Sequence, residues 1–64
     1  MTDMQQIEIA RYRDEIRDDV RALVEKYRRA MDWDIPENDD RRSDRLILQA
    51  IETALAEVRE SLGV

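Results

Sequence analysis

Few residues of this chain have side chains that could carry out covalent chemistry. The sequence has no Cys and no His, which removes the side chains that most often serve as nucleophile and general base. The aliphatic hydroxyls belong to Thr2, Ser43, Thr53 and Ser61. None of them has an evident activator, and Ser43 is better placed to cap a helix. We therefore predict no catalytic residues and a protein that is not an enzyme.

A short acidic segment offers hard oxygen ligands of the kind that Ca²⁺ prefers. These side chains are Asp32, Asp34, Glu37, Asn38, Asp39 and Asp40. The spacing does not match a calcium loop, because Pro36 occupies the third ligand position and no Gly follows where an EF-hand loop turns. We predict no specific metal site and no cofactor-binding residues.

The same segment contains Trp33 and Ile35, its only apolar residues. One interpretation is that both side chains fold back to close the end of a helical bundle near Tyr27, Met31 and Ile47. The alternative is a partner-binding element formed by Trp33, Asp34 and Ile35, since Trp is enriched at binding hot spots. The burial of Trp33 distinguishes the two interpretations.

A row of arginines in the first half of the chain is a second candidate for partner binding. Its members are Arg13, Arg17, Arg21 and Arg28. The first three repeat at every fourth residue, and like charges at this spacing cost a few tenths of a kcal/mol per pair in an isolated helix. An acidic surface is therefore expected over the row. It would be either the carboxylates of a neighbouring helix (Glu52, Glu57 or Glu60) or of a symmetry mate, or else a phosphate or acidic partner.

These residues must be positioned by helices, because the apolar residues recur at helical spacing. At about 100° per residue, the apolar residues of the first half form one stripe about 100° wide. The stripe contains Ile9, Tyr12, Ile16, Val20, Leu23, Tyr27, Ala30 and Met31. This pattern predicts one continuous helix over residues 3–31, which Thr2 or Asp3 can cap.

An acidic loop over residues 32–43 is expected to follow, because Pro36 disfavours a helical Ile35. A second helix over 44–62 begins after Ser43, or after Asn38 or Asp39 as alternative caps, and ends at Gly63. Its apolar stripe contains Ile47, Leu48, Ile51, Ala54, Leu55, Val58 and Leu62. The predicted fold is all-α: an antiparallel two-helix hairpin that forms a single domain over residues 1–64.

A hairpin of this size cannot cover its own apolar faces. Chains this short bury a small fraction of their surface and usually need disulfides, a metal or a partner, and the first helix would outrun the second by about 13 Å. Pairing of two hairpins into a homodimeric four-helix bundle meets both needs. The expected core and dimer residues are Ile9, Tyr12, Ile16, Val20, Leu23, Tyr27, Ile47, Leu48, Ile51, Leu55, Val58 and Leu62.

Charge and hydropathy narrow the expected partners further. Nearly all of the net charge of −5 lies in residues 32–44, and a negative protein is a poor ligand for phosphate, so nucleic acid is not the expected partner. No apolar run approaches the ~18 residues of a membrane span, and the N-terminus lacks the pattern of a signal peptide. We expect a cytoplasmic protein without a membrane partner.

Residues 42–55 resemble the second helix of ribbon-helix-helix repressors, in which a Ser-capped helix carries an apolar pattern of this type. The resemblance implies a DNA-reading strand over residues 6–13, paired with its equivalent across a dimer. Arg11 and Arg13 would then face the major groove.

The preferred hypothesis is a small non-enzymatic interaction module that homodimerises and contacts a larger protein. Such modules act as adaptors, assembly factors or stoichiometric inhibitors, including those made by phages. A dimeric DNA-binding regulator of ribbon-helix-helix type is the alternative, and a minor helical subunit of a larger complex is the third hypothesis.

Overall fold

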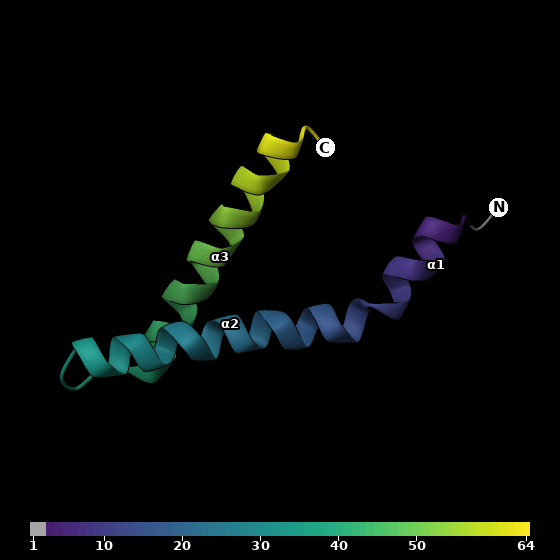
Figure 1. The fold of residues 1–64 in the computed structure, drawn as a ribbon. Helices are drawn as coiled ribbons and strands as arrows, with labels where there is room; N and C mark the ends of the chain where they lie inside the picture. Colours follow the sequence, from purple (N-terminus) through teal and green to yellow (C-terminus); the bar gives the residue numbers. More distant parts are fainter. Residues whose placement is uncertain (1–2) are drawn as a thin grey trace.

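Three helices make up the regular structure in the computed structural model, which describes residues 3–64. They are α1 (Met4–Arg11), α2 (Arg13–Asp34) and α3 (Asp40–Leu62). α2 and α3 pack as a hairpin, and α1 continues from the far end of α2 (Figure 1). The all-α prediction is confirmed, but three helices replace the two that were expected.

The predicted continuous helix over 3–31 is wrong, because it is divided at Tyr12. This residue has φ −88° and ψ −2°, at the margin of the right-handed helical region. α1 bends there toward the side on which α3 leaves α2 (Figure 1). Aromatic and β-branched residues such as Tyr12 and Ile9 have lower helix propensity, and α1 packs on α2 but not on α3. Sharp bends usually coincide with Pro or Gly, and neither marks this position.

The N-terminal segment is helical where the ribbon-helix-helix resemblance implies a strand. Residues 6–11 lie within α1, and Arg13 is the first residue of α2. The expected DNA-reading strand over 6–13 is therefore wrong: this segment is helical. Asp3 caps α1 by accepting a hydrogen bond from the Gln6 backbone N–H at 2.7 Å. Thr2, the alternative cap, lies outside the described residues.

The connection between α2 and α3 is shorter than the predicted loop over 32–43. It covers only residues 35–39. α2 continues through Asp34 and stops at Ile35, which is extended (φ −121°, ψ 111°), as expected for a residue before Pro. Glu37 then adopts a left-handed conformation with φ 57°, an unusual conformation for a residue other than Gly or Asn.

α3 starts four residues earlier than predicted because Asp39, not Ser43, is its cap. The Asp39 carboxylate accepts hydrogen bonds from the backbone N–H groups of Arg41 and Arg42. Ser43 consequently lies inside the helix, where it is buried. The predicted end is confirmed, since Gly63 has the left-handed φ of 75° that terminates helices.

The hairpin is open, and its packed part lies near the loop. Ile47 is the single buried apolar side chain among residues 3–64, and Val20 and Ile51 are half-buried. Beyond this point α3 diverges from α2 (Figure 1). The remaining predicted core residues are exposed: Ile9, Tyr12, Ile16, Leu23, Tyr27, Leu48, Leu55, Val58 and Leu62.

Candidate functional site

An apolar groove lies between α2 and α3. Its volume is about 610 Å³. Its lining consists of Leu23, Tyr27, Ala30, Met31, Asp34, Leu46, Ile47, Ala50, Ile51, Ala54 and Leu55. Asp34 is the only charged side chain in this set, so the groove offers contact area for apolar side chains and very little for polar recognition.

The groove forms because the apolar faces of α2 and α3 face each other while the two helices diverge. Near the loop the two faces are in contact, and Ile47 is buried between the helices. Further along, the same stripes no longer meet, and Leu55 stays 62% exposed. On the α2 side, the Lys26 ammonium lies 5.3 Å from the centre of the Tyr27 ring, a cation–π geometry.

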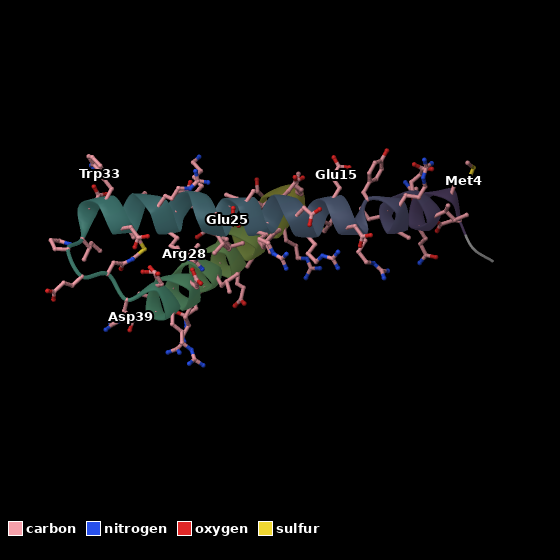
Figure 2. The ribbon with its side chains drawn as sticks, turned by 90° about the horizontal axis from the view of Figure 1, so that it is seen from below. Met4, Glu15, Glu25, Arg28, Trp33 and Asp39 are labelled. Atoms are coloured by element: carbon pink, nitrogen blue, oxygen red, sulfur yellow. The ribbon has the colours of Figure 1, made fainter. Side chains whose placement is uncertain are left out.

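An ion pair between Arg28 and Asp44 connects the two helices beside the groove. Arg28 Nε donates to Asp44 Oδ1 at 2.7 Å, and Nη2 donates to the second carboxylate oxygen. This bidentate hydrogen bond lowers the pKa of Asp44 below its ordinary value. It also raises the pKa of Arg28 above its ordinary value. Figure 2 shows Arg28 directed toward α3.

The other arginines of the predicted row do not form a common site with Arg28. Arg17 pairs with Asp14 at 3.3 Å within α2, and Arg13 borders a shallow pocket at the junction of α1 and α2. Arg21 makes no ion pair with a carboxylate within residues 3–64. Over that same range, no arginine of the row pairs with Glu52, Glu57 or Glu60 of α3, in contrast to one of the two expectations.

Polar side chains at the loop bind one another. The Ser43 hydroxyl donates to Asn38 Oδ1 at 2.7 Å, and the Asn38 amide donates to Asp32 at 2.7 Å. Two effects of Asp32 raise the pKa of Asp40: its negative charge and a hydrogen bond between the two side chains. This network orients the loop, and it leaves the Ser43 hydroxyl beside an amide, which is not a base that could activate it.

The three candidate binding residues near the loop, Trp33, Asp34 and Ile35, lie in different environments. Trp33 lies in the last turn of α2 and is 90% exposed, and Figure 2 shows it on the side of α2 opposite Arg28. Asp34 borders the groove, and Ile35 borders a small pocket with Met31 and Leu46. The interpretation of Trp33 as a plug of the bundle is therefore wrong, whereas Ile35 does approach Met31.

Sequence reasoning missed Asp44 and the polar network of Ser43. Arg28 and Asp44 are 16 residues apart, so no helical spacing connects them, and their pairing depends on how α2 and α3 cross. Ser43 is the expected cap of α3, with Asn38 and Asp39 as alternatives. The presence of these two cap-forming residues several positions before Ser43 was the available signal for a helix that starts early.

Comparisons with known proteins complete this description. No family model matches the chain, and neither curated proteins nor solved structures gave a match. Within residues 3–64, none of the helices has the length and apolar character needed to cross a membrane. In the same range, no group of three or more acidic side chains is arranged to hold a metal ion.

Proposed function

We propose that this chain is a small non-enzymatic protein–protein interaction module that acts as a homodimer. Two hairpins would pair through their α2–α3 grooves to form a four-helix bundle. The dimer would then contact a larger protein, as an adaptor, an assembly factor or a stoichiometric inhibitor.

The observation that carries this proposal is the amount of surface that the single chain leaves exposed. Its accessible surface is 6179 Å², whereas a compact protein of 7.7 kDa exposes about 4,300 Å². Its radius of gyration is 15.5 Å, compared with about 11 Å for a compact domain of this length. The single chain therefore resembles part of a larger folded unit.

The excess area is sufficient for a stable dimer. About 1,800 Å² per chain is exposed beyond the compact expectation, and a standard interface buries about 800 Å² on each partner. Much of the exposed area is apolar, because Leu55, Val58 and Leu62 of α3 are all more than half exposed. Covering such a surface is the dominant favourable contribution to protein association.

The chemistry of the chain supports a binding role over a catalytic one. The sequence contains neither Cys nor His, and the one buried hydroxyl, that of Ser43, donates to an amide oxygen. The titratable groups with perturbed pKa values are Arg28 and Asp44, which pair with each other, and Asp40 at the start of α3. All three lie outside the groove lining, so the groove combines no acid, base and nucleophile.

Sedimentation of the purified chain over a wide concentration range tests this proposal. We expect a species of twice the 7.7 kDa chain mass at micromolar concentration and a melting temperature that rises with concentration, because association stabilises the folded state. A folded, cooperatively melting monomer at all concentrations would contradict the proposal. A hetero-complex that forms only with a host protein would retain the interaction role and exclude the homodimer.

A further inference from the structure

Two apolar surfaces of the chain lie apart from each other in the single copy. The first is the C-terminal half of α3, where Leu55, Val58 and Leu62 are all more than half exposed. The second is the concave side of the bend between α1 and α2, where Ile9 and Ile16 are exposed. α1 packs on α2 but not on α3, so neither surface covers the other within one chain.

The concave side of this bend, which we call the α1–α2 bend, forms a shallow pocket of about 380 Å³. Its lining consists of Gln6, Ile9, Ala10, Arg13 and Ile16. Ile9, Ala10 and Ile16 offer apolar contact area, and Gln6 and Arg13 can donate hydrogen bonds. Donors of this kind suit the C-terminal end of a helix, because the last carbonyls of a helix have no intrahelical partners.

The α1–α2 bend and the α2–α3 groove open on the same face of α2. Ile16 borders the bend and Leu23 borders the groove, and a separation of seven residues places them within about 20° of each other around the helix. Figure 1 shows α1 and α3 leaving α2 toward the same side. A second copy that covers the groove is therefore also near the bend.

The two apolar surfaces match in length, and a second copy can cover both. Leu55 and Leu62 are seven residues apart on α3, or ~10 Å of helix, and Ile9 and Ile16 are separated by the same number of residues. The chain exposes about 1,800 Å² more than a compact protein of its mass. This excess is about twice what each partner buries in a standard interface.

We propose that, in the homodimer, the C-terminal half of α3 of each copy is seated in the α1–α2 bend of the other copy. Val58 of one copy would then lie against Ile16 of its partner. Because a twofold interface is isologous, the same contact is made twice. The inference rests on the proposed homodimer and adds which surfaces of the two copies meet.

Cross-linking between introduced cysteines tests this contact, because the chain has no Cys of its own. Ile16→Cys and Val58→Cys are prepared as separate variants, mixed, and treated with a short bismaleimide. We expect a covalent dimer of twice the 7.7 kDa chain mass in the mixture and little in either variant alone. Efficient cross-linking of Val58→Cys alone would mean that α3 meets α3, which would overturn the proposal.

A matched pair of variants controls for random collision. Asp18→Cys and Ala56→Cys each lie two residues from a test position, about 160° around the same helix, and both sites are exposed. Their mixture should not cross-link. Equal cross-linking of the two mixtures would overturn the proposal.

The double variant Ile16→Cys with Val58→Cys separates exchange between copies from closure of one hairpin. We expect the bismaleimide to join two chains. A cross-link within one 7.7 kDa chain, detected by mass spectrometry, would show that α3 closes onto its own α2 and would overturn the proposal.

Sedimentation provides an independent measurement and separates this inference from the homodimer itself. Val58→Asp should raise the dissociation constant by about tenfold or more, because it places a carboxylate in the seat, whereas Ala56→Asp should dimerise like the wild type. A dimer that is unaffected by Val58→Asp and gives no specific cross-link retains the homodimer and contradicts the seating of α3. A wild-type chain that stays monomeric contradicts both.

Discussion

The substitution Leu55→Asp tests whether a second copy covers the open groove. Leu55 borders the groove but is 62% exposed in the single chain. Because complete burial of Leu contributes about 1.5–3 kcal/mol, covering the remaining surface would contribute about 1–2 kcal/mol per copy. In a twofold dimer both copies lose this contribution, so the total loss is about 2–4 kcal/mol. A loss of this size increases the dissociation constant about 30-fold or more.

The cost of placing a carboxylate in the interface adds to this loss. In a monomer, by contrast, the same change is a surface substitution and alters the free energy of unfolding by about 0.5 kcal/mol or less. A dimer that buries Leu55 and a monomer are therefore expected to respond differently to Leu55→Asp.

Sedimentation velocity with interference detection measures the dissociation constants directly. Trp33→Asp is the matched control, because it also replaces a large apolar side chain by a carboxylate, at a site that is 90% exposed and lies away from α3 (Figure 2). We expect the control to dimerise like the wild type. A dimeric Leu55→Asp variant with an unchanged dissociation constant would refute the assignment of the groove as the interface.

Three further predictions concern the stability of the hairpin. Ile47→Ala removes the one buried apolar side chain of residues 3–64 and should lower the free energy of unfolding by about 2 kcal/mol or more in urea titrations; an unchanged midpoint would mean that Ile47 does not anchor the hairpin. Asp44 has a lowered pKa because it binds Arg28, so its contribution is present above its ordinary pKa and is lost as the pH falls through the lowered value. Asp44→Asn should thus lower the melting temperature at pH 7, and the difference should decrease as the pH falls below the ordinary pKa of an aspartate and through the lowered value. Asp40 has a raised pKa because of Asp32, so its ionisation opposes folding above the raised value, and this penalty is absent below its ordinary pKa. Asp40→Asn should raise the melting temperature at pH 7 and leave it unchanged near pH 2, and a decrease at pH 7 would contradict the repulsion from Asp32.

The interior of each helix could be predicted from local sequence because the signals are local. The stripe of α3 and its end at Gly63 agree with the structure. α2, by contrast, continues past the predicted end at residue 31 to Asp34. The break at Tyr12 could not be predicted, since neither Gly nor Pro accompanies it. The early start of α3 depended on which of Asn38, Asp39 and Ser43 would form the cap, and propensity ranks these residues almost equally.

The candidate site was predictable in composition but not in arrangement. Most apolar residues of the groove belong to the two predicted stripes, and Leu46 and Ala50 lie beside the second stripe. The contacts of individual charged and aromatic side chains could not be predicted. Arg28 belongs to the predicted row of four arginines, yet its partner is Asp44. Trp33 was placed in a loop, yet it occupies the last turn of α2.

The sequence by itself determined the helical class, the apolar stripes and the deficit of core residues, because these follow from periodicity, composition and length. Only the tertiary structure decided that Ile47 is the single buried apolar side chain of residues 3–64, that Arg28 is bound by Asp44 and that Trp33 faces outward from α2 (Figure 2). These features depend on the angle and the register at which α2 and α3 cross. The conformation of the five-residue connection and the packing near it set both, and no pattern within a single helix encodes them.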